Sequence, residues 1–109
     1  MQKSQAELTR SAKILLKMTE KEKALEMLPS WFQGEVYELG DEVRNPFSGE
    51  TCLLDAAELS MYDHIKGLEL AIIMNIPIFD LGDKYIDIID KGKDWFLIKN
   101  PNAYMILID

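Results

Sequence analysis

The segment from Asp55 to Asn75 constrains the fold most, because both of its ends carry helix signals and its interior has helical periodicity. Asp55-Ala56-Ala57-Glu58 has the spacing of a capping box with an acidic cap. Asn75-Ile76-Pro77 ends the helix near Met74. Its apolar residues fall within about 60° of one another on one helix face; they are Met61, Ile65, Leu68 and Ile72. The segment therefore predicts a long amphipathic helix.

Similar signals predict three further helices. Residues 4–7 have the spacing of a capping box, and residues 19–22 repeat it, so an N-terminal helix restarts after a bend and ends at Pro29. A second long helix begins near Leu81 to Asp83 and continues to Lys99. A short last helix follows over residues 100–108, where Asn100 is the cap and Pro101 takes the first helical position.

The segment between the first helix and Asp55 predicts β-structure. Glu35 to Leu39 alternates polar and apolar residues, as a half-buried strand does. Residues 42–44 and 51–54 flank Asn45-Pro46-Phe47-Ser48-Gly49, which suits a turn that closes a hairpin. We therefore predict an α+β fold, mainly helical, with about four helices and a small antiparallel sheet between the first and second long helices. Residues 1–29 form a helical arm and residues 30–109 a compact body.

Composition excludes several classes of protein. The longest apolar stretch, Leu70 to Met74, is far shorter than the roughly 20 residues that span a bilayer. The first residues lack the apolar core of a signal peptide. A net charge of −7 opposes broad contact with a phosphate backbone. We therefore expect a cytoplasmic protein without a membrane segment and without direct nucleic-acid contact.

Charge is distributed unevenly along the chain. Residues 1–28 hold six basic and four acidic residues, whereas residues 29–109 hold six basic and fifteen acidic residues. The mildly basic arm either packs on its own acidic body or directs a partner.

The residues that carry chemistry do not form a recognisable catalytic or metal site in the sequence. Asn45-Pro46-Phe47-Ser48-Gly49 has the shape of a zinc knuckle, but both sulfur ligands are absent. His64 is the only histidine, and the adjacent Asp63 points about 100° away from it on a helix, so His64 is interpreted as structural. Cys52, the only cysteine, lies in a predicted strand without a basic cluster and is interpreted as a packing residue. No catalytic residue, metal or cofactor is expected.

Four aspartates form the most regular polar pattern. Asp83, Asp87, Asp90 and Asp94 share one face of the second long helix, with Gly92 at the centre of the opposite, apolar face. The aspartates are spread over about 16 Å, too far for one calcium site. They are either a solvated face or a docking stripe for a basic partner. Gly92 predicts that a backbone or a bulky ring approaches closely.

Four apolar residues are candidates for protein contacts. Leu70 and Met74 lie with Gly67 on the outer side of the first long helix, where they contact a partner or the N-terminal helix. Trp31 and Phe32 follow Pro29 and anchor the arm to the body.

Three groups of residues, in this order, resemble a group of short bacteriophage proteins. They are Gly40-Asp41-Glu42-Val43 with Asn45 to Glu50; Glu58, Tyr62-Asp63 and Ile65-Lys66-Gly67; and Trp95-Phe96, Asn100-Pro101, Ala103-Tyr104 and Leu107-Ile108-Asp109. The resemblance is to proteins encoded mostly by marine bacteriophages and related bacteria, which have no assigned activity. It covers roughly residues 40–109 and implies a viral accessory protein without naming a site.

These observations favour a non-enzymatic protein–protein interaction module, a phage accessory or virion-associated protein of the host cytoplasm or the virion. Its partner is another protein or a second copy of the chain. The contact residues are predicted to be Trp31, Phe32, Leu70 and Met74 for apolar docking and Asp83, Asp87, Asp90 and Asp94 for charge. The alternative is an acidic inhibitor that occupies a basic, nucleic-acid-binding surface of a host enzyme.

Overall fold

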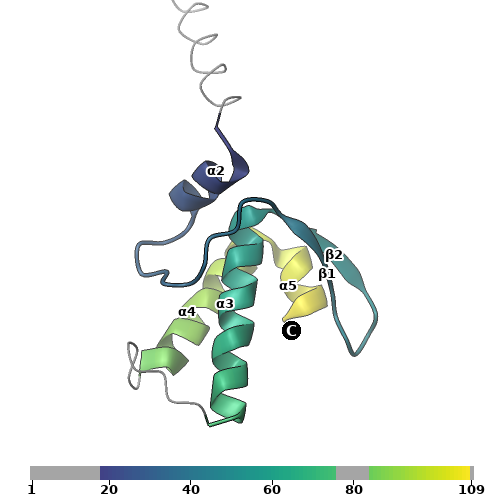
Figure 1. Ribbon diagram of the computed structural model, residues 1–109. Helices are drawn as coiled ribbons and strands as arrows, with labels where there is room; N and C mark the ends of the chain where they lie inside the picture. The colour runs from purple at the N-terminus through teal and green to yellow at the C-terminus, as the bar shows by residue number, and fades with distance from the viewer. Residues whose placement is uncertain (1–17, 76–83, 109) are drawn as a thin grey trace, which may run out of the picture.

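The computed structural model describes residues 18–75 and 84–108, and this part of the chain is an α+β fold (Figure 1). Its elements are α2 (Glu20–Met27), β1 (Asp41–Arg44), β2 (Thr51–Leu54), α3 (Ala56–Ile73), α4 (Tyr85–Lys99) and α5 (Pro101–Leu107). The two strands form an antiparallel sheet between α2 and α3 along the chain, which confirms the predicted fold class. The helix predicted from Ser4 and the predicted start of the second long helix near Leu81 lie outside the described residues.

Helix α2 begins at the predicted restart. Thr19 has an extended backbone, and its hydroxyl accepts a hydrogen bond from the Glu22 backbone N–H at 3.1 Å. The helix ends at Leu28, because a residue before proline is sterically excluded from the helical conformation. Ala24 is buried against Ala56 and Ala57, so α2 packs on the first turn of α3.

The hairpin turns where the sequence predicts it. Val43 pairs with Cys52, and the loop closes with a hydrogen bond from Asn45 N–H to Glu50 C=O at 2.8 Å. The side-chain oxygen of Asn45 accepts from the Phe47 N–H at 2.8 Å, and its amide nitrogen donates to the Ile106 carbonyl at 2.8 Å. Asn45 therefore both shapes the loop and ties the hairpin to α5.

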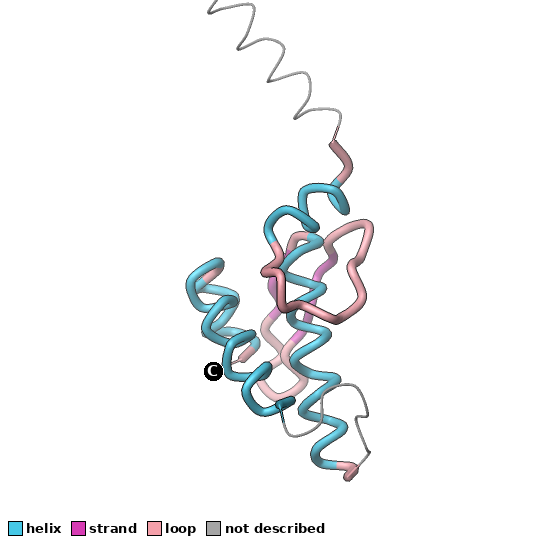
Figure 2. The backbone as a smooth tube through the Cα atoms, turned by 90° about the vertical axis from the view of Figure 1, so that its left-hand side faces the viewer, coloured by secondary structure: helices cyan, strands magenta, loops and turns pink. Residues whose placement is uncertain are grey.

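The strand predicted over Glu35–Leu39 is wrong, because the structure assigns no strand to these residues. The Tyr37 N–H donates to the Ser60 hydroxyl at 3.0 Å, so this backbone group bonds to a helix side chain and not to a neighbouring strand. Figure 2 shows the loop between α2 and β1 lying against the upper half of α3. Burial does not follow the alternation either, since Val36 and Tyr37 are half-buried while Leu39 is 68% exposed.

Helix α3 begins with the predicted capping box. The Glu58 N–H donates to the Asp55 carboxylate at 2.8 Å, and the Asp55 N–H donates back to the Glu58 carboxylate at 2.9 Å. Met61, Ile65 and Leu68 are buried as predicted. Ile72, predicted on the same buried face, is 40% exposed. It shares the buried direction, but it lies in the last turn of α3, beyond the last residue of the helix that the described elements bury, Leu68.

Gly92 lets α4 approach α3 closely. A Cβ atom at this position would lie 2.9 Å from Cγ1 of Ile65 and 3.2 Å from the sulfur of Met61. The prediction of a close approach is confirmed, but side chains occupy the space and not a backbone or a ring. Close packing at Gly92 aligns the two helices side by side.

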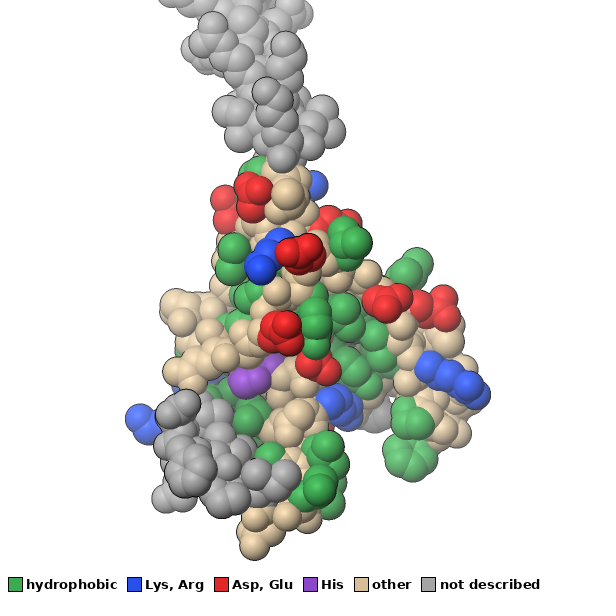
Figure 3. Space-filling view, in the orientation of Figure 1, with side chains coloured by type: hydrophobic (Ala, Val, Ile, Leu, Met, Phe, Trp, Pro, Cys, Tyr) green, Lys and Arg blue, Asp and Glu red, His purple; other side chains and the backbone are tan. Residues whose placement is uncertain are grey.

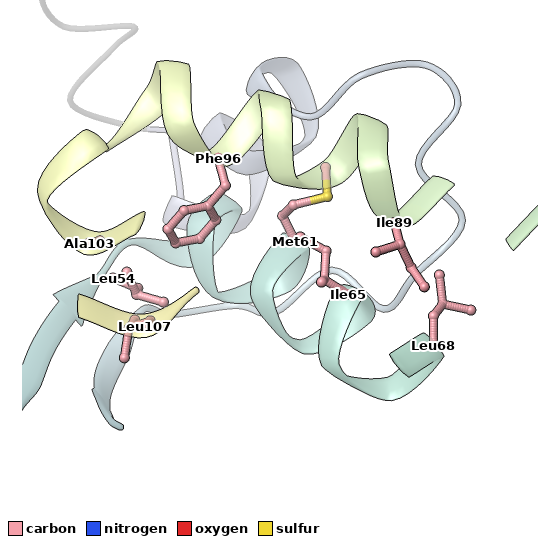
Figure 4. Packing of buried hydrophobic residues seen from close by; sticks show 8 residues of the cluster. All are labelled: Leu54, Met61, Ile65, Leu68, Ile89, Phe96, Ala103 and Leu107. Carbon is pink, nitrogen blue, oxygen red and sulfur yellow. The ribbon is translucent and has the colours of Figure 1, made fainter. Parts of the chain in front are cut away.

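The core forms where α3, α4, α5 and β2 meet, as Figure 4 shows. Phe96 of α4 is completely buried and lies near Leu54 of β2 and Leu107 of α5. Helix α5 is held there by its predicted cap, because the Asn100 side chain accepts from the Ala103 N–H at 3.1 Å. This core fixes the upper half of α3 and leaves its lower end covered by fewer elements.

Candidate functional site

The C-terminal end of α3 and the first turn of α4 carry a group of exposed aliphatic side chains, which we call the apolar end. It consists of Leu70, Ile72, Ile73, Met74 and Ile86. Ile73 is 80% exposed, and Leu70, Met74 and Ile86 are each more than half exposed. Figure 3 shows hydrophobic side chains at the lower end of the molecule, where α3 ends. Two of the predicted contact residues, Leu70 and Met74, are therefore exposed at this end of α3.

A groove runs through the apolar end. It has a volume of about 290 Å³ and is lined by Glu69, Ile72, Ile73, Ile86 and Ile89. Glu69 is the charged residue of this lining, and the Lys66 and Lys93 ammonium groups each lie 3.4 Å from one of its carboxylate oxygens. The Lys93–Glu69 ion pair joins α4 to α3 beside the groove.

The described aspartates of the stripe on α4 are exposed. Exposure is expected both for a solvated helix face and for a docking stripe. Asp87, Asp90 and Asp94 lie on the side of α4 away from α3. Within residues 18–75 and 84–108, no lysine or arginine forms an ion pair with any of the three. Asp83, the fourth predicted member, lies outside the described residues. Asp87, the first described member of the stripe, directly follows Ile86, so the stripe adjoins the apolar end.

Trp31 and Phe32 are less exposed than Leu70 and Met74. Both are half-buried and pack against the core. The Phe32 ring meets the His64 ring edge-on, with centroids 5.2 Å apart. The two residues therefore attach the loop after α2 to the body, and in this conformation they do not form one surface with the apolar end.

His64 sits beneath the loop that follows α2. Burial lowers the pKa of His64 below its ordinary value, and the nearby Asp63 carboxylate opposes this change. Asp63 itself accepts a hydrogen bond from the Tyr37 hydroxyl at 2.6 Å, which raises the pKa of Tyr37 to about 12. The imidazole Nε2 is buried and has no hydrogen-bond partner among the described residues. Asp63 thus binds Tyr37 and does not orient the imidazole.

Cys52 is half-buried in β2 and packs against the core, as predicted for a packing residue. Burial raises the pKa of its thiol, and the Glu58 carboxylate acts in the same direction, so the reactive thiolate is disfavoured. In the described part of the chain, no three His, Cys, Asp or Glu side chains are grouped in a way that would hold a metal ion.

Sequence reasoning missed an exposed aromatic side chain at the hairpin tip. Phe47 is 97% exposed, and together with Tyr62, Lys66 and Leu107 it borders a second groove of about 370 Å³. Figure 3 shows this hollow between the hairpin and α3. The signal that could have identified Phe47 as exposed is its position in the sequence. It lies between Pro46 and Ser48 in a turn, where a side chain has no strand or helix to pack against.

Comparisons with known proteins give no relative from which a function can be transferred. No family model, curated protein or solved structure matches the chain. Among the described helices, none is both long enough and apolar enough to span a bilayer. The candidate site therefore rests on the geometry of the apolar end and the aspartate stripe.

Proposed function

We propose that the protein is a non-enzymatic interaction module that docks a partner protein on the apolar end. The proposal includes a phage accessory or virion-associated role, in the host cytoplasm or in the virion, which rests on the resemblance of residues 40–109 to phage proteins. The partner contributes an apolar surface that fills the groove between Ile73 and Ile86.

One observation carries the proposal: three exposed aliphatic side chains from two helices, Ile72, Ile73 and Ile86, line the same groove. Contiguous exposed apolar surface on a folded domain marks a contact site, because leaving it in water is unfavourable. The chain already has a core that buries Met61, Ile65 and Phe96, so this surface is not needed for packing among the described elements.

The surroundings of the two reactive side chains support a non-enzymatic role. Nε2 of His64 is buried, and the Cys52 thiol has a raised pKa. A general base must come within hydrogen-bond reach of the substrate proton, and a nucleophilic cysteine needs a lowered pKa.

The test is affinity capture from host cells with the wild-type chain and with an Ile73→Gln/Ile86→Gln variant. Full burial of an aliphatic side chain contributes about 1.5–3 kcal/mol, so the variant should bind the partner at least roughly tenfold more weakly. Capture by the wild type should persist at high salt, because apolar contact is not screened.

The matched control is Leu39→Gln, which makes the same kind of change at a side chain that is 68% exposed in a loop. It should capture the partner as the wild type does. Equal capture by the Ile73→Gln/Ile86→Gln variant would show that the partner binds elsewhere.

A second candidate is an acidic inhibitor that covers a basic surface of a host enzyme. Asp87, Asp90 and Asp94 favour it, since all three are exposed and unpaired within the described ranges. Binding of this kind weakens steeply with salt. Changing all three to asparagine should abolish such binding, whereas the neutralisation of Glu38, Glu42 and Glu50, exposed acids outside α4, should not. Salt-independent capture would exclude this candidate.

A further inference from the structure

Residues 31–37 cross α3 as a short segment that we call the strap. Three contacts hold it: the hydrogen bond from Tyr37 N–H to Ser60 Oγ at 3.0 Å, the hydrogen bond from the Tyr37 hydroxyl to Asp63 at 2.6 Å, and the edge-on contact of Phe32 with His64. Gly34 passes so close that a Cβ atom there would lie 2.7 Å from the Phe32 ring and 2.8 Å from Cγ of His64. The strap thus packs tightly against the Cβ–Cγ side of His64, which is half-buried and visible at the surface in Figure 3.

The closed strap suits a neutral imidazole better than a charged one. Nε2 of His64 is buried and has no hydrogen-bond partner among the described residues. In the neutral ring this nitrogen can remain an unprotonated acceptor, while an imidazolium would place a charged N–H there without an acceptor among the described residues. The cost of the charge falls if the strap moves away and water reaches the ring.

We propose that the strap is a pH-sensitive cover, which is closed over α3 while His64 is neutral and is released when His64 is protonated. Release removes the Phe32 ring from the His64 ring. This switch is independent of the apolar end and of the proposed function.

Among the described residues, the charged groups around the ring do not cancel this effect. Asp63 is the neighbouring carboxylate on α3, and it favours protonation, but burial has the larger effect and lowers the pKa of His64. From the strap, Phe32 and Gly34 contribute no charge at the ring. Glu35, the acidic residue of the strap, is exposed and acts on the Tyr37 hydroxyl, whose pKa of about 12 keeps it protonated.

The direction of the pH dependence follows from linkage. His64 has a lower pKa under the closed strap than in water, so the open state binds more protons. Stabilisation of the closed state is fully present above about pH 6.5, the ordinary histidine value, and is lost as the pH falls through the pKa of the closed state.

The test uses NMR on the full-length chain, in which His64 is the sole histidine and gives one titrating ring signal. We expect a pKa for His64 below 6.5. Protection of the Tyr37 amide against hydrogen exchange should fall at least several-fold between pH 7 and pH 5, after correction for intrinsic exchange. The amides of Ile65 and Phe96 in the core should keep their protection.

Two variants separate the switch from general weakening of the strap. His64→Gln keeps a polar, uncharged side chain and should remove the pH dependence of Tyr37 protection. Tyr37→Phe loses the hydrogen bond to Asp63 and should lower protection at both pH values while retaining the pH dependence. A His64 pKa of 6.5 or above in the wild type would overturn the proposal. The same pH dependence in His64→Gln, or joint loss of strap and core protection, would also overturn it.

Discussion

Replacing Phe96 by alanine is expected to lower the free energy of unfolding by about 3–5 kcal/mol, the range for truncation of a buried aromatic residue. Phe96 is completely buried, and its ring centroid lies 6.4 Å from the Tyr62 ring and 6.4 Å from the Trp95 ring. Its loss leaves a cavity where α3, α4, α5 and β2 meet, and chemical denaturation of the two proteins measures the cost.

Ile98→Ala provides the matched control for Phe96, because it truncates an apolar side chain of the same helix. Ile98 is 83% exposed, so its truncation should change the free energy of unfolding by no more than about 0.5 kcal/mol. Similar losses from both changes would contradict the position of α4 described above.

The second large effect is expected at Gly40, which lies against the start of α3. A Cβ atom at Gly40 would lie 2.0 Å from the Leu54 carbonyl oxygen and 2.8 Å from Cα of Asp55. Both neighbours are backbone atoms that cannot turn aside, so Gly40→Ala should cost about 1–3 kcal/mol of folding free energy, with the upper end favoured. Thermal and denaturant unfolding measure the loss.

Gly67→Ala should have the opposite sign. Gly67 is exposed in the middle of α3, and a Cβ atom there would meet nothing within 4 Å. Alanine is favoured over glycine in a helix interior by about 1 kcal/mol, so this variant should be more stable than the wild type. A Gly40→Ala variant as stable as the wild type or more stable would contradict the packing of Gly40 against the hairpin and the α3 cap, and a destabilised Gly67→Ala variant would contradict the open space at Gly67.

Local signals in the sequence predicted the helix ends well. The caps at Thr19, Asp55 and Asn100 satisfy backbone N–H groups within three residues, so each depends on neighbours in the sequence. The hairpin could be predicted equally well from the sequence, because Asn45 and Gly49 determine its turn. Gly49 has a positive φ of 78°. Such features need no knowledge of the rest of the fold.

Long-range partners could not be predicted. The alternation in Glu35–Leu39 suggested a strand because periodicity does not reveal whether a backbone N–H bonds to a strand or, as for Tyr37, to a helix hydroxyl. Periodicity likewise placed Ile72 on the buried face, but it does not reveal where the packed body ends. The strap over His64 depends on contacts between residues about 30 positions apart.

The candidate site was only partly predictable for the same reason. A helical wheel separated Leu70 and Met74 from the core side of α3, and exposure at both positions agrees with it. Ile73 and Ile86 are brought together by the packing of two helices, which a wheel of either helix does not show. Trp31 and Phe32 were grouped with the exposed residues because aromatic side chains serve both anchoring and docking.

The most direct test of the proposed docking surface is hydrogen–deuterium exchange of the full-length chain, alone and with its captured partner at saturation. The docking account predicts new protection in residues 69–74 and 85–90, which carry the apolar end, with little change in the hairpin at residues 41–54. Protection that is confined to the hairpin, or that is absent from the end of α3, would contradict it.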